Sequence, residues 1–188
     1  MVKRLLAFGD SNTYGYDPRS YFGGRYDAED RWVDVLAQIK DWEIINAGEN
    51  GREIPKRRWE IEDFRELCRR SAPFDCVLIL LGGNDLLQGA FPDEIAARME
   101  TFLLQCEVEL EKTVLIGPPA LGLGAWVADE ALVRASKEFA VRYEELAKRL
   151  GIRYIDASQW DIPLTFDGVH YAPEGHRAFA RLLAEKLQ

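Results

Sequence analysis

The sequence predicts an α/β protein in which a five-stranded parallel sheet lies between two layers of helices. Five short apolar runs recur along the 188 residues, and longer amphipathic segments lie between them. That alternation is typical of parallel strands joined by crossover helices, and hence of a three-layer α/β/α domain. We expect the strands at Leu5–Phe8, Glu43–Asn46, Cys76–Leu81, Thr113–Ile116 and Arg153–Ile155.

The segments between these runs carry apolar residues at helical spacing, which predicts amphipathic helices packed on the sheet. The last two are the clearest, and Gly151 is a natural end for the fourth of them. We expect the helices at Arg31–Ile39, Trp59–Arg70, Pro92–Glu111, Asp129–Leu150 and Pro173–Leu187.

Composition and length predict one domain, residues 1–188, with a substantial core. No internal repeat, low-complexity tract or linker interrupts the pattern. The 32 acidic and 24 basic residues give a net charge of −8, which opposes attraction to nucleic acid or to an anionic membrane surface. We therefore expect neither as a partner.

Targeting and metal signals are also missing from the sequence. The first apolar run is too short for a signal peptide, and no stretch approaches a membrane span, so we expect a cytoplasmic protein. The three cysteines form no C-x-x-C pair and the chain has two histidines, which predicts neither a disulfide framework nor a metal site.

Small or polar residues follow every expected strand. In an open parallel sheet, functional groups gather beyond the carboxyl ends of the strands, so these segments should line a cleft. The first four strand exits are Gly9-Asp10-Ser11-Asn12, Asn46-Ala47-Gly48-Glu49-Asn50-Gly51, Gly82-Gly83-Asn84-Asp85 and Gly117-Pro118-Pro119, and the fifth strand continues to Asp167 and His170.

Ser11, His170 and Asp167 are candidates for a nucleophilic site. A serine becomes nucleophilic when an imidazole base removes its proton, and a carboxylate fixes the tautomer of that base. Asp167 and His170 lie three residues apart, so one turn can join them. Read singly, Ser11 could merely cap a helix and a histidine in a turn could be structural. His176 competes as the base, but it falls within the last expected helix.

Acyl transfer also needs hydrogen-bond donors aimed at the oxygen that becomes negative. The candidates are the backbone amides of Ser11 and Gly51 and the side-chain amide of Asn84. The competing interpretations are a plain turn at Asn84 and a positive φ at Gly51.

Taken together, these four blocks resemble the SGNH, or GDSL-like, hydrolase superfamily of esterases, lipases and acyltransferases. The blocks are Gly9-Asp10-Ser11, Gly51, Gly82-Gly83-Asn84-Asp85 and Asp167-Gly168-Val169-His170. The resemblance implies a flavodoxin-like fold and no cofactor. It implies Ser11 as nucleophile, His170 as base with Asp167 as its partner, and Ser11, Gly51 and Asn84 as oxyanion donors.

Two positions qualify the resemblance. Asn12 stands where the family's name has leucine, and Gly48 competes with Gly51, which fits the family's spacing better. The stretch from Gly9 to Gly15, with Arg31-Trp32 ahead, is most similar to the bacterial arylesterase and acyltransferase branch.

The resulting hypothesis is a serine carboxylic-ester hydrolase that acts on small, short-acyl (acetyl or aryl) esters through an acyl-enzyme. Aromatic residues such as Tyr16 and Trp126 in the exit loops suit an aryl or short acyl group. A carbohydrate O-acetyl esterase is an alternative, and so is a non-catalytic flavodoxin-like domain that holds an anionic ligand on backbone amides. The sequence is also compatible with a homo-oligomer.

Overall fold

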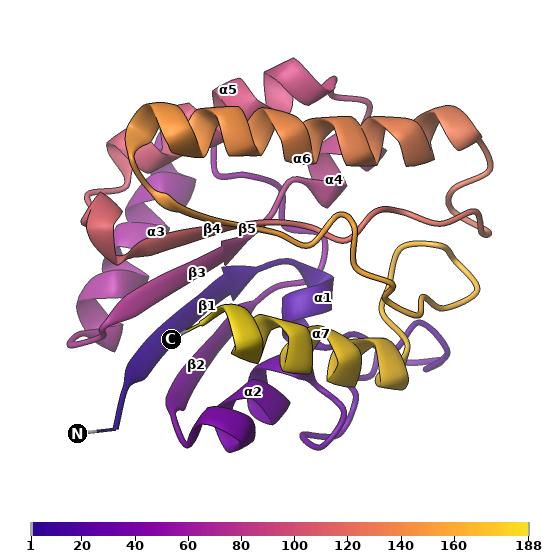
Figure 1. Cartoon of the computed structure of the whole chain (residues 1–188), viewed down its shortest axis with the longest axis horizontal. Helices are drawn as coiled ribbons and strands as arrows, with labels where there is room; N and C mark the ends of the chain where they lie inside the picture. The colour runs from indigo at the N-terminus through magenta and orange to yellow at the C-terminus, as the bar shows by residue number, and fades with distance from the viewer. Residues whose placement is uncertain (1, 188) are drawn as a thin grey trace.

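The computed structural model describes residues 2–187 and contains a five-stranded sheet in the order β2-β1-β3-β4-β5 (Figure 1). Every neighbouring pair of strands in this sheet is parallel, as the sequence predicts. The strands are β1 (Arg4–Gly9), β2 (Glu43–Gly48), β3 (Cys76–Leu80), β4 (Thr113–Gly117) and β5 (Arg153–Asp156).

Helices cover both faces of the sheet, so the predicted three-layer architecture is confirmed (Figure 1). Helices α2 and α7 pack on one face, and α3, α4, α5 and α6 lie on the other. The helices are α1 (Ser11–Tyr14), α2 (Trp32–Lys40), α3 (Arg58–Ser71), α4 (Gly83–Leu87), α5 (Pro92–Gln105), α6 (Glu130–Leu150) and α7 (Pro173–Lys186), with a 3-10 turn at Leu110–Lys112.

The interior strand β1, between β2 and β3, is buried on both faces and joins two apolar cores. Side chains alternate across a strand. Leu6 and Phe8 therefore enter the core under α3, α5 and α6, while Leu5 and Ala7 enter the core under α2 and α7. The register pairs Gly9 at the end of β1 with Gly48 of β2 and Leu80 of β3, so the three strands end together.

The long helices follow the sequence prediction, with one correction. Helix α6 begins at an Asp129 cap that accepts from the Ala131 N–H, and it ends at Gly151, whose φ is 69°. The helix expected to reach Glu111 is shorter, because α5 ends at Gln105. Glu107 has a φ of 61°, a left-handed conformation that an α-helix cannot continue through.

The sequence prediction misses α1 and α4, two short helices that directly follow the interior strands β1 and β3. Each is too short to show a periodic apolar pattern. Local chemistry starts them instead: the Asp10 side chain accepts from the Asn12 N–H at α1, and Gly82 before α4 has a φ of 114°. These two helices present Ser11 and Asn84 at the carboxyl edge of the sheet. Among the helices of residues 2–187, none is both long and apolar enough to cross a bilayer.

Candidate active site

Ser11 is the first residue of α1 and is buried at the carboxyl end of β1. Gly9 makes the turn before it tight. A Cβ at Gly9 would lie 2.1 Å from Thr13 Oγ1 and 2.9 Å from the Leu80 carbonyl oxygen, so a side chain there would displace α1. Strand β1 and the Asp10 cap of α1 therefore fix where the Ser11 hydroxyl lies.

The loop that carries His170 is folded around the Asp167 carboxylate. Asp167 Oδ1 accepts hydrogen bonds from Thr165 Oγ1 at 2.8 Å, from the Val169 N–H at 2.8 Å and from the His170 N–H at 2.9 Å. Gly168 turns the chain with a φ of 79°, and a Cβ there would lie 2.2 Å from the Gly122 carbonyl oxygen. The second carboxylate oxygen, Oδ2, is left for the His170 ring, 2.7 Å from Nδ1.

The structure brings together the three residues that the sequence predicts. His170 Nε2 lies 2.9 Å from Ser11 Oγ, although the two residues are 159 positions apart in the chain. A carboxylate can only accept, so Nδ1 carries the proton and Nε2 is free to accept from the serine hydroxyl. Ser11, Asp167 and His170 are all buried. This is the arrangement of a nucleophile, a base and the group that orients the base.

The two buried carboxyl groups near Ser11 differ in pKa. Burial acts to raise the pKa of Asp167, but hydrogen bonds from the His170 side chain and backbone and from Val169 outweigh it and lower the pKa to about 2. Burial raises the pKa of Asp10 to about 6, because its bond from Asn12 and the charges of His170 and Arg52 offset only part of the desolvation. Asp167 thus stays ionised beside the imidazole at neutral pH.

The three predicted oxyanion donors lie on two adjoining walls. Ser11 and Asn84 line one small cavity of about 30 Å³, together with Pro118, Leu121 and Val169. Gly51 is exposed and lines the neighbouring groove instead. The two walls meet where Asn84 Nδ2 donates to the Arg52 carbonyl oxygen at 2.9 Å. Within residues 2–187, the N–H groups of Ser11 and Gly51 have no acceptor.

Asp85 is a buried residue that fixes this junction and that the sequence analysis treats only as part of a motif. Its carboxylate accepts from the Ile54 N–H and from Arg98 Nη1, each at 2.9 Å. It thereby ties the turn after β2 to α4. The one sequence signal for this role is an acidic residue directly after Asn84, at a strand exit.

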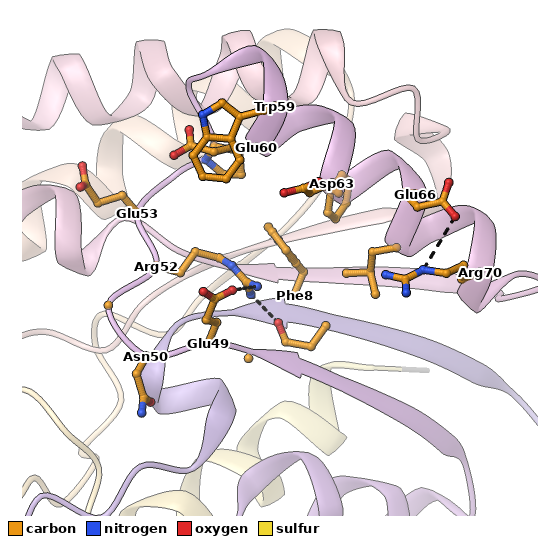
Figure 2. Close-up of a pocket in the computed structure, with 16 residues that line it drawn as sticks. Phe8, Glu49, Asn50, Arg52, Glu53, Trp59, Glu60, Asp63, Glu66 and Arg70 are labelled. Carbon is orange, nitrogen blue, oxygen red and sulfur yellow. Dashed lines mark hydrogen bonds and ion pairs between the residues drawn. The ribbon is translucent and has the colours of Figure 1, made fainter. Parts of the chain in front are cut away.

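A larger groove of about 660 Å³ lies between the turn after β2 and helix α3 (Figure 2). Four of its charged side chains form two ion pairs, Arg52 with Glu49 at 2.6 Å and Arg70 with Glu66 at 3.9 Å. Arg52 also lies over the Phe8 ring, 4.2 Å from its centroid. No serine, threonine, cysteine or histidine is among the residues that line this groove.

Two aromatic rings, those of Tyr16 and Trp126, lie against the His170 ring. The ring centroids of Tyr16 and Trp126 lie 4.9 Å and 5.2 Å from that of His170. Trp126 is 56% exposed, so its ring is available to a ligand. Both residues belong to the loops that the sequence analysis expects at the cleft.

His176, the competing histidine, is fully buried in α7, and its ring is not hydrogen-bonded to Ser11. Cys68, Cys76 and Cys106 are free thiols. Burial raises the pKa of each thiol. None of these four residues lines the cavity at Ser11.

Comparison with solved structures finds esterases of the same fold. The aryl esterase of M. smegmatis has a TM-score of 0.81 and 26% identity, with 99% of this chain and 98% of that chain covered. Est24, a carbohydrate acetylesterase from Sinorhizobium meliloti, has a TM-score of 0.81 and 25% identity, with 98% of each chain covered. A lipase/acylhydrolase from Enterococcus faecalis, at 21% identity and a TM-score of 0.76, shares the fold over 99% of this chain and 95% of its own.

Sequence comparison gives the family. No curated protein matches the chain. The sequence model of the GDSL-like Lipase/Acylhydrolase family matches residues 7–178, which include every strand exit described above. The chain therefore belongs to the GDSL-like lipase/acylhydrolase family and is a carboxylic ester hydrolase.

Proposed function

We propose that Ser11, His170 and Asp167 are the catalytic triad of this ester hydrolase. The observation that carries the proposal is the chain of two short hydrogen bonds, 2.9 Å from Ser11 Oγ to His170 Nε2 and 2.7 Å from His170 Nδ1 to Asp167 Oδ2. Ser11 Oγ attacks the ester carbonyl carbon while Nε2 takes its proton. The imidazolium then gives that proton to the leaving alcohol, and Asp167 stabilises the positive ring throughout.

A water molecule completes the cycle by the same route. His170 Nε2 removes a proton from the water, the resulting oxygen attacks the acyl-enzyme carbonyl, and the proton returns to Ser11 as the acid leaves. No further group is needed for either half-reaction.

The oxyanion that forms in both halves would be bound by the Ser11 N–H, the Gly51 N–H and Asn84. An amide nitrogen carries two N–H groups, so Asn84 keeps one donor free while the other holds the Arg52 carbonyl. Support for the two backbone donors comes from their lack of an acceptor within residues 2–187. The carbonyl that Asn84 holds belongs to the residue after Gly51, so the two candidate donors are anchored to each other.

The substrate class we propose is a short-acyl ester of an aromatic alcohol or of a sugar. The cavity at Ser11 is small, and apolar side chains such as Leu87, Leu121 and Phe139 close it, which suits an acetyl to butyryl group. The leaving alcohol must lie beside His170 to receive its proton, between the Tyr16 and Trp126 rings. A flat aromatic or sugar face can pack on these rings.

The sugar-ester alternative has its own support in the exposed Trp126 ring and in the likeness to a carbohydrate acetylesterase. Rates on acetylated sugars and on p-nitrophenyl acetate, compared for wild type and Trp126→Ala, distinguish the two classes. The substitution should lower kcat/KM most for the class that packs on Trp126.

Covalent labelling tests the nucleophile. A p-nitrophenyl phosphonate should release one equivalent of p-nitrophenol and add its mass to the peptide that contains Ser11. The Ser11→Ala variant should be folded, unlabelled and inactive on p-nitrophenyl acetate. Labelling of another residue, or most of the wild-type rate in folded Ser11→Ala, would contradict the serine mechanism. It would favour the alternative of a binding domain.

Acyl-chain length tests the cavity. Each methylene that a groove can bury contributes about 0.8 kcal/mol, so a long apolar groove would make kcat/KM rise steadily with chain length. A closed cavity turns further methylenes into clashes, so we expect a maximum at two to four carbons and a decline beyond. A p-nitrophenyl series from acetate to palmitate measures this, and a maximum at octanoate or longer would contradict the closed cavity.

A further inference from the structure

Asn12, the residue after Ser11, connects helix α1 to the loop of His170. Its side-chain Nδ2 donates to the Val169 carbonyl oxygen at 3.1 Å, and its Oδ1 accepts from the Tyr171 N–H at 2.9 Å. The two bonded groups lie on either side of His170 in the chain. The Asn12 backbone is itself fixed, because its N–H donates to Asp10 Oδ1 at 2.9 Å.

These two bonds complete the hydrogen bonding of the backbone around His170. The two peptide units that flank its Cα carry four polar groups. Two are bonded inside the loop: the His170 N–H to Asp167 Oδ1 at 2.9 Å and the His170 carbonyl to the Thr165 N–H at 2.8 Å. The other two, the Val169 carbonyl and the Tyr171 N–H, are bonded by Asn12. Asn12, the neighbour of Ser11, therefore makes two of the four hydrogen bonds to the peptide units around His170.

The chemistry of this contact requires a carboxamide. The Val169 carbonyl can only accept and the Tyr171 N–H can only donate, so the bridging side chain needs one donor and one acceptor on a short stem. The same requirement fixes which amide atom faces which group. Leucine, the residue that ends the GDSL motif, offers neither, and an ionised aspartate offers two acceptors.

We propose that Asn12 is a positioning residue that keeps His170 Nε2 within hydrogen-bond distance of Ser11 Oγ by binding both peptide units around His170. The inference rests on the proposed triad and goes beyond it. Ser11 and His170 come from opposite ends of the chain, and neither the cap at Asp10 nor the Asp167 loop fixes one relative to the other. A displacement of about 1 Å between reacting groups costs on the order of a hundredfold in rate.

Asn46 offers a matched control, because it is also an asparagine whose side chain makes two hydrogen bonds, one of them to α1. Its Nδ2 donates to the Thr13 carbonyl at 2.8 Å, and its Oδ1 accepts from the Gly48 N–H at 2.9 Å. The first bond attaches α1 to β2, the second lies within β2, and neither reaches the His170 loop. A variant at Asn46 therefore removes as many side-chain hydrogen bonds, one of them to α1, without touching the groups that flank His170.

The experiment compares Asn12→Leu, Asn12→Ala and Asn46→Ala with wild type. It measures kcat and KM on p-nitrophenyl acetate, the rate of phosphonate labelling at Ser11, and hydrogen exchange of the Tyr171 amide by NMR. For both Asn12 variants we expect kcat and the labelling rate to fall ten- to hundredfold, KM to stay within about twofold, and the Tyr171 amide to exchange at least tenfold faster. For Asn46→Ala we expect Tyr171 exchange at the wild-type rate and a smaller loss of kcat.

Several results would overturn the inference. They are an Asn12→Ala protein that keeps more than half of the wild-type kcat, an unchanged Tyr171 exchange rate, or an equal loss of kcat in Asn46→Ala. If leucine prevents folding, Asn12→Ala decides, and failure of both to fold also counts against a positioning role. Failure of the triad itself gives a different result, because wild type would then not be labelled at Ser11.

Discussion

The two histidines of this chain have nearly the same packing and different partners. His170 is 3% exposed and its ring lies between Tyr16 and Trp126, at centroid distances of 4.9 and 5.2 Å. His176 is fully buried and its ring lies between two tyrosines, Tyr26 and Tyr171, at 5.4 and 5.3 Å. Burial among aromatic rings therefore does not distinguish a base from a structural histidine here.

The distinction lies in the polar groups that each ring meets. His170 has a carboxylate on Nδ1 and a hydroxyl on Nε2. His176 has the Trp32 N–H at 3.5 Å from Nδ1, and its Nε2 has no partner within residues 2–187. Burial, helped by the nearby charges of His170 and Arg31, lowers the pKa of His176 to about 3. His176 thus remains neutral at the pH where a base must gain and lose a proton.

The largest expected effect is on activity, and it tests directly whether His170 or His176 is the base. Replacement of a triad histidine typically costs on the order of 10⁶-fold in kcat, so His170→Asn should remove nearly all hydrolysis of p-nitrophenyl acetate. His176→Asn should keep most of it, because neither ring nitrogen of His176 is hydrogen-bonded to Ser11 or to a carboxylate within residues 2–187. Circular dichroism of both proteins checks that they are folded. The reverse pattern would show that the wrong histidine has been assigned.

A smaller loss of activity is expected when a proposed oxyanion donor, Asn84, is replaced. Asn84→Ala should lower kcat by roughly 10²- to 10³-fold with little change in KM, because its hydrogen bond strengthens only as the carbonyl oxygen becomes negative. Asn50→Ala is a suitable control, since Asn50 is exposed on the wall of the neighbouring groove (Figure 2). A change confined to KM would make Asn84 a substrate-binding residue instead.

The smallest expected effect is on the pH dependence of the free energy of unfolding, and it tests whether His176 stays neutral when buried. Its pKa is about 3 in the folded protein and near 6.5 when unfolded, so between these values the unfolded chain binds a proton that the folded chain does not. Wild type should therefore lose stability as the pH falls from 6.5, and His176→Asn should lose less. The difference should approach about 1.4 kcal/mol per pH unit.

Urea unfolding of both proteins between pH 4 and 7 measures this difference. Asp10 titrates in the same range in the opposite sense, since burial raises its pKa to about 6, but it is present in both proteins and cancels from the difference. Parallel stability curves would mean that His176 is solvated or paired when charged.

Much of this protein follows from its sequence alone, because the signals are local or periodic. Alternating apolar runs predict the five parallel strands, and Gly151 predicts the end of α6. Small and polar residues at the strand exits identify Ser11, Asn84, Asp167 and His170 as candidates, since parallel strands all end at one edge of the sheet.

The tertiary structure decides what depends on contacts between distant segments. No pattern in the sequence predicts that Asn12 bonds both sides of His170, or that Asp85 joins Ile54 to Arg98, because these partners are up to 159 positions apart. The structure also separates His170 from His176 by their polar partners and divides the strand exits between two cavities, with Gly51 on the wall of the larger one. Hydrogen-bond geometry depends on differences of tenths of an ångström, which only the packed fold determines.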